Sequence, residues 1–310
     1  MSTASLTPGA APAPEEAIDL PRLERSLRHP RTLLSAVLTG CTWVIAVVAM
    51  VPLFSVLSML AFKGGKRLGI ALFTELPPAA GMIGGGIGNA LLGTLLVVFL
   101  ATLMSVPVGV LGGVFLAEIA PEGRTARAVR FSAKLLTGLP SILAGVFAYT
   151  TVVLLTGRFS PLAGGIALAL LMVPTIILTA EDAIRMVPAR MREAAIGMGA
   201  TQTQVVLRIL LPTARPGIVT GILLAISRAA GETAPLLFTM TFSDYWLTRN
   251  LMEPTASLAV LIYNFSKSPF ENQKEIAWAA SLVLVFLVLL LTVGGQALSR
   301  SAHRLVGART

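Results

Sequence analysis

Residues 188–212 read PARMREAAIGMGATQTQVVLRILLP, a polar interruption between two long apolar segments of the chain. A stretch with so many charged and polar side chains cannot cross the hydrocarbon core of a membrane, where each such group is costly. It therefore lies outside the hydrocarbon, whereas the apolar segments on both sides of it are suited to span a bilayer.

The pattern within residues 188–212 predicts two short helices joined at a bend. Pro188 suits a first helical position, and Gly199 suits the end of that helix. Thr201 and Gln204 have the capping-box spacing that starts a second helix. The first helix has one apolar face, made by Met191, Ala194, Ala195 and Met198. A groove on a soluble partner could hold such a bent pair, although a passive connector at the membrane surface has the same pattern.

The composition of the whole chain is that of a polytopic membrane protein. Of 310 residues, 55% are hydrophobic and 13% are charged, and the mean hydropathy is +0.82. The single cysteine, Cys41, excludes a disulfide framework, and with two histidines it offers no metal cluster. The glycine-rich residues 81–88 lack the Gly-Lys-Ser/Thr sequence of a phosphate loop, so we predict no nucleotide site and no cofactor in this chain.

Six apolar segments predict an all-α fold with about six transmembrane helices. The first, residues 33–61, precedes a core of five spans within residues 87–297. Residues 1–32 are expected to form a disordered, basic tail, and residues 298–310 a second tail. The spans cover approximately residues 33–61, 87–117, 135–156, 162–180, 217–242 and 276–297.

The distribution of charge predicts the orientation in the membrane. The chain has 24 Lys+Arg against 15 Asp+Glu, a net charge of +9. Arginines gather in both tails, in the loop after the second span and in residues 188–212. Because basic loops remain in the cytoplasm, we predict that both termini and residues 188–212 are cytoplasmic.

A charged pair, Arg228 and Glu232, lies inside the fifth apolar segment. If that span is one helix, both residues are near mid-span and share a face with small residues, opposite Leu223. A charge at that depth costs at least about 2.5 kcal/mol, so a function is the default hypothesis. The alternative is an ion pair four residues apart that only holds helices together. The small residues are Gly217, Gly221, Ala225 and Ala229.

The spacing in residues 188–212 resembles a known family motif. Glu193-Ala194-Ala195, three residues, Gly199, nine residues and Ile-Leu-Leu-Pro is similar to the E-A-A-x3-G-x9-I-x-L-P loop of ABC-importer permeases. The resemblance implies that this loop couples the permease to a separate ATPase. It also implies the fold of a type I importer permease and an ATPase-coupling role for Glu193, Ala194, Ala195 and Gly199.

Two further segments resemble the phosphate-importer permeases of the PstA type. They are E-L-P-P followed by G-G-G-I-G-N-A in residues 75–90, and S-R-A-A-G-E-T-A-P in residues 227–235. The resemblance implies that Arg228 and Glu232 line an anion path. Residues 179–182, TAED, are similar to a T-E-[DN] element of these permeases, but Ile177 and Leu178 stand where a basic residue is expected. Glu181 and Asp182 are expected to lie in the headgroup region.

The resemblance also implies the partners of the chain. They are an ATPase similar to PstB that holds ATP and Mg, a second permease similar to PstC, and an external phosphate-binding protein similar to PstS. The chain would then be a cell-membrane transport subunit without enzymatic activity of its own. Two alternatives stay open: a permease for another oxyanion or metabolite, and an ion-coupled carrier that needs no ATPase.

Overall fold

The computed structural model describes residues 30–307, and it describes the burial of side chains from residue 32 to 297. Every regular element in this part of the chain is helical, as the sequence predicted. The expected disordered tail, residues 1–32, falls almost entirely outside the described residues, as do residues 308–310.

Within residues 30–307, five helices are long and apolar enough to cross a membrane. A sixth span results if a helix pair bent by 104°, Arg124–Thr137 and Ser141–Thr156, is counted as one. The hydropathy pattern predicts that the third span starts near Leu135, but the helix turns at residues 138–140, because Pro140 prevents it from continuing. The five long helices are Thr32–Gly65, Gly88–Ile119, Pro161–Arg185, Gln202–Ala230 and Glu271–Ala297.

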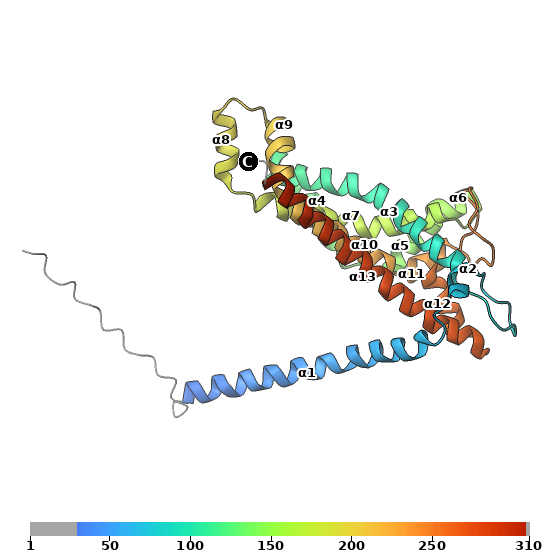
Figure 1. Ribbon diagram of the computed structural model, residues 1–310. Helices are drawn as coiled ribbons and strands as arrows, with labels where there is room; N and C mark the ends of the chain where they lie inside the picture. The colour runs from blue at the N-terminus through green and yellow to red at the C-terminus, as the bar shows by residue number, and fades with distance from the viewer. Residues whose placement is uncertain (1–29, 308–310) are drawn as a thin grey trace, which may run out of the picture. The chain divides into compact units, whose positions relative to one another are not determined.

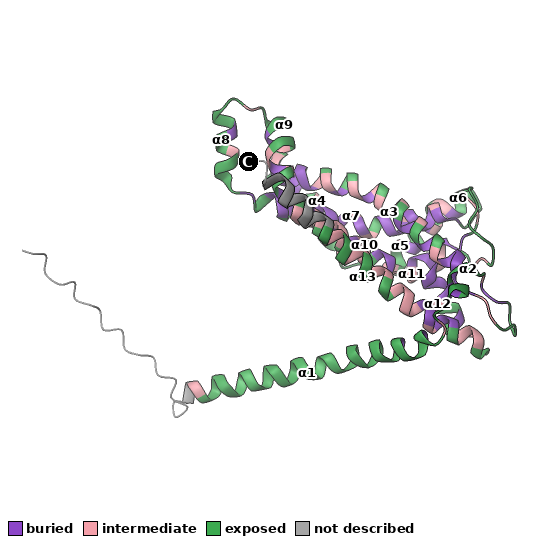
Figure 2. Ribbon diagram, in the orientation of Figure 1, coloured by how far each residue is buried: buried purple, intermediate pink, exposed green. Residues whose placement is uncertain are grey.

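The first helix, α1 (Pro30–Gly65), belongs to two compact units, one ending at Val56 and one starting at Leu57. Residues 33–56 are exposed along the whole helix, including Trp43 and Phe54 (Figure 2). An apolar helix whose side chains are exposed on every face is suited to lipid.

The second unit is built around α7 (Pro161–Arg185), which packs against α3 (Gly88–Val114) and α10 (Leu211–Ala230) (Figure 1). Half of the residues in the most apolar 18-residue stretch of α7 are buried. Glycine makes the close approach to α3 possible, because a Cβ at Gly109 would lie 2.5 Å from Cγ2 of Ile176. The shared core consists of apolar side chains such as Val97, Leu168 and Met172.

Helix α10 packs on α7 through the small-residue face that the sequence predicted. A Cβ at Gly221 would lie 2.1 Å from the Thr179 hydroxyl, and one at Gly217 would lie 2.8 Å from Cβ of Ala183. Leu223, on the opposite face, lies against Gly295 of α13 (Glu271–Gly307), so α10 is held between two helices.

The end of the bundle that carries α2 (Ile70–Thr74) and α12 (Leu258–Ser266) is closed by loops (Figure 1). The Asn89 side chain donates to the backbone oxygens of Ser243 and Tyr245, at 2.8 and 3.2 Å, and its Oδ1 accepts from the Ala90 amide at 2.7 Å. The Thr94 hydroxyl accepts a bond of 2.8 Å from the Leu258 amide. These bonds tie α3 to the chain that follows the fifth span.

Three π-helical turns interrupt the helices: η1 (Phe115–Ile119), η2 (Tyr149–Val153) and η3 (Val206–Leu210). The turn η1 ends the long helix that starts with α3, and η3 joins α9 (Gln202–Val205) to α10. Such turns rearrange the hydrogen-bond ladder and are frequent at functional sites. Of these turns, η3 lies within residues 188–212, and η1 contacts them through the Gln202 side chain.

Candidate functional site

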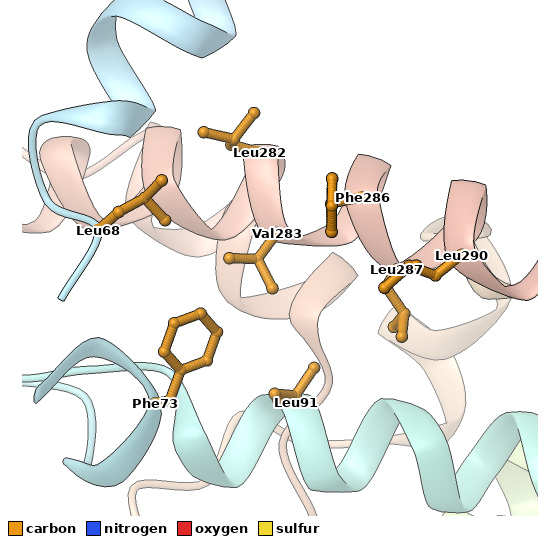
Figure 3. A pocket seen from close by; sticks show the side chains of 8 residues that line it. All are labelled: Leu68, Phe73, Leu91, Leu282, Val283, Phe286, Leu287 and Leu290. Atoms are coloured by element: carbon orange, nitrogen blue, oxygen red, sulfur yellow. The ribbon is translucent and has the colours of Figure 1, made fainter. Parts of the chain in front are cut away.

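An apolar hollow in the second unit has no chemistry for an anion. It has a volume of about 510 Å³ and lies between α13 and the start of α3 (Figure 3). Its lining is entirely apolar, with Leu68, Phe73, Leu91, Leu282, Val283, Phe286, Leu287 and Leu290. An anion needs hydrogen-bond donors or positive charge, so we place the candidate sites elsewhere.

The structure brings Arg228 and Glu232 together. Arg228 Nε donates to Glu232 Oε1 at 3.4 Å, while 52% of the arginine side chain and 17% of the glutamate side chain are exposed. The long, weak bond and the open guanidinium leave N–H donors of Arg228 free to bind another oxygen. Arginine is permanently charged, and its planar fork can donate to two oxygens of an oxyanion.

The expectation of one helix through both residues is wrong. Helix α10 ends at Ala230, with Gly231 as its C-cap, and a new short helix α11 covers Ala234–Thr239. Pro235 has no N–H for a continuous helix, so the chain breaks before it. Arg228 therefore lies in the last turn of α10, where a positive charge is favourable to the helix dipole.

The segment after the break is held firmly by its neighbours. A Cβ at Gly145 of α5 (Ser141–Ala148) would lie 2.6 Å from Cα of Pro235, so the two backbones touch. The Ser160 amide donates to the carbonyl of Thr239 at 3.1 Å. The segment from Pro235 to Thr239 is thus held against α5 and the start of α7.

The residues of the 179–182 element do not join this site. Glu181 is 4% exposed. Its Oε1 accepts from Arg130 at 2.7 Å and from Arg185 at 2.9 Å. Glu181 therefore clamps α4 (Arg124–Thr137) to α7. Asp182 is exposed.

The second candidate site is the loop 188–212, which lies at the end of the bundle away from α12 (Figure 1). Helix α8 covers Ala189–Gly197, one residue later than predicted, and Pro188 is its N-cap. Gly199 has φ +85°, a left-handed conformation that ends the helix as predicted. The predicted capping box of Thr201 and Gln204 is confirmed at the start of α9.

The apolar face predicted for α8 is largely uncovered by this chain. Ala195 is 1% exposed, but Met191 is 41% and Met198 82% exposed; Ile196, which was not part of the predicted face, is 57% exposed. Glu193 and Ala194 are also exposed. A cluster of exposed apolar side chains on a projecting helix is a surface that suits a protein partner.

A further residue, Glu118, contacts this loop and was not singled out by the sequence. Its side chain is 6% exposed and forms an ion pair with Arg192 of α8. Gln202 of α9 donates to the backbone oxygen of Glu118 at 3.2 Å. Because 74 residues separate Glu118 from Arg192, no local pattern could predict the pair.

Among residues 30–307, no group of three His, Cys, Asp or Glu side chains is placed to hold a metal ion. The two candidate sites are thus a charged pair at a helix break and a projecting helical loop. Neither site brings together a nucleophile, a base and an oxyanion hole. The two sites are suited to binding a ligand or a protein partner and to changing conformation.

Comparisons with known proteins give consistent results. Residues 109–304 match the family model described as "binding-protein-dependent transport system inner membrane component". The chain is 41% identical to the phosphate transport system permease protein PstA of Yersinia pestis, over 84% of this chain and 85% of that protein. It is 40% identical to the protein of the same name from Haemophilus influenzae, over 82% of this chain and 89% of that protein.

Among solved structures, a chain of the MetNI methionine ABC transporter in an inward-facing conformation matches with a TM-score of 0.57. The sequence identity is 22%, and the match covers 68% of this chain and 93% of that chain. At this identity the likeness supports the fold alone. It is the fold of an ABC importer permease.

Proposed function

Because this chain belongs to the binding-protein-dependent transport system inner membrane component family, we propose that it is the permease subunit of an ATP-driven importer of inorganic phosphate. It is a multi-pass inner membrane protein, and it relies on a separate ATPase and a binding protein, because the family has no ATPase site of its own. The ion-coupled carrier considered from the sequence is thereby set aside.

The assignment of phosphate is carried by one observation: about 40% identity over four fifths of the chain with permeases whose names state phosphate. We infer that the specific partners follow the same system. They are an ATPase of the PstB kind, a second permease of the PstC kind and a binding protein of the PstS kind. ATP and Mg would bind to the ATPase.

We propose that Arg228 and Glu232 belong to the anion path. The support is the break in helix α10 beside them. Non-helical backbone at membrane depth is tolerated where it is buried in protein or lines a water-filled cavity. An open guanidinium beside such a break can bind phosphate oxygens.

A carboxylate next to that guanidinium has a second effect. It repels a fully ionised anion, but it accepts a hydrogen bond from an anion that keeps a proton. Phosphate keeps a proton near neutral pH, and sulfate does not. Glu232 would therefore favour phosphate over sulfate.

We propose that Glu193, Ala194, Ala195 and Gly199 form the element that couples to the ATPase, with Glu193, Ala194 and Gly199 at its surface and Ala195 buried beneath them. The support is the exposure of the apolar side chains on α8 and the bend at Gly199. Because ATP is cytoplasmic, this proposal places residues 188–212 in the cytoplasm. Arginines also gather in both tails of the chain, which supports a cytoplasmic position for both termini.

The proposal is tested with the complete importer in proteoliposomes, with ATP on the side of the loop. We expect ATP-dependent uptake of radiolabelled phosphate that requires the binding protein, and little uptake of sulfate or molybdate. Uptake of another oxyanion in preference to phosphate would show a different cargo. Uptake by this chain without the ATPase would refute the importer assignment.

A further inference from the structure

One residue, Glu118, connects both helices of the loop 188–212 to the end of the long helix that starts with α3. The Glu118 carboxylate accepts from the guanidinium of Arg192 on α8. The Glu118 carbonyl accepts from the Gln202 side chain on α9, at 3.2 Å. These contacts leave α8 and α9 with a shared attachment point in η1.

The covalent connections of the loop lead elsewhere. Its N-terminal end continues from α7, and its C-terminal end continues through η3 into α10. Neither connection reaches α3, although α3 packs along α7 through the core of the bundle. The contacts at Glu118 are therefore direct links between the loop and the long helix that starts with α3.

The environment of Glu118 makes this link stiff. Its side chain is 6% exposed, whereas that of Arg192 is 35% exposed. The Nε of Arg192 is buried without a hydrogen-bond partner, so the guanidinium depends on Glu118 for its strong acceptor. A buried carboxylate that loses its cation is left uncompensated, which makes separation of the pair costly.

We propose that Glu118 is a positioning residue for energy coupling: through Arg192 and Gln202 it makes the long helix that starts with α3 move with the loop. The inference rests on the proposed function, since only a loop driven by an ATPase has a movement to pass on. A polar hollow of about 400 Å³ beside the pair is lined by Arg130, Arg185 and Arg192. All three arginines already have carboxylate partners, which favours the mechanical role over an anion site.

The test measures uptake per ATP hydrolysed by the complete importer in proteoliposomes, together with the amount of ATPase that co-purifies. We expect the double substitution E118L/R192M to assemble at wild-type abundance, because neither charge is left unpaired. Its uptake per ATP should fall at least five-fold, because an apolar contact is non-directional and lets the loop shift relative to the long helix. The matched control is E122Q, an exposed carboxylate four residues away, which should keep the wild-type ratio.

A second pair of variants separates positioning from folding. R192K keeps the charge and should retain at least half of the wild-type uptake per ATP, whereas R192Q should retain less than one fifth. Equal ratios for these two variants, or a wild-type ratio in E118L/R192M, would overturn the proposal. Failure of the proposed function gives a different result, because the wild-type complex itself would then show no ATP-driven phosphate uptake.

Discussion

Arg228 and Glu232 lie on the two sides of the point where α10 ends, and their side chains still meet at 3.4 Å. The arginine belongs to the last helical turn, while the glutamate follows the Gly231 C-cap. The pair therefore joins the end of one helix to the break that follows it. A movement of the break relative to α10 would change this distance.

Substitution of Arg228 should stop transport without removing the protein from the membrane. We expect R228A to lose phosphate uptake by at least 100-fold, and R228K to lose it about ten-fold, because an ammonium cannot donate as a planar fork. The control is R215A, an exposed arginine on the same helix, which should transport normally. Wild-type uptake by R228A at normal abundance would reduce Arg228 to a structural part.

Neutralising Glu232 should change the choice of anion. E232Q removes the carboxylate that repels a fully ionised anion, so we expect the preference for phosphate over sulfate in uptake to fall at least five-fold. D244N, which removes an exposed carboxylate from the loop after α11, should keep the wild-type preference. An unchanged preference in E232Q would exclude this role.

The substitution G199A should weaken binding of the ATPase to the loop. The residue has φ +85°, and no atom lies within 4 Å of an added Cβ, so backbone conformation and not space decides the effect. A left-handed alanine costs about 1–2 kcal/mol, which corresponds to a Kd for the ATPase about five- to thirty-fold higher. The control is G197A on the same helix. Gly197 also has no atom within 4 Å of an added Cβ, but its φ is not positive, so G197A should bind the ATPase with the wild-type Kd.

Removing the charge of Glu181 should destabilise the bundle. E181Q leaves the paired guanidinium groups of Arg130 and Arg185 with a weaker acceptor, and we expect a loss of about 1–3 kcal/mol in unfolding free energy. The measurement is thermal unfolding of the purified complex in detergent. D182N, at the exposed neighbour, should leave the midpoint unchanged, and equal midpoints for the two variants would contradict the clamp.

Parts of the candidate sites could be predicted from local sequence. The capping box of Thr201 and Gln204 and the left-handed Gly199 depend only on neighbouring residues, and both were predicted. The break after Ala230 also has a local cause, in Gly231 and Pro235. The apolar run through these residues predicts a single span, but Gly231 and Pro235 within it end the helix.

The sequence by itself determined that this protein is helical, spans a membrane and carries a polar loop between its spans. Hydropathy and helical periodicity act over a few turns, so they can be read without knowing what touches what. Only the tertiary structure decided that Glu118 binds Arg192, that Glu181 binds Arg130, and that Leu223 faces α13. Those partners are distant in the chain, and only packing of the helices brings them into contact.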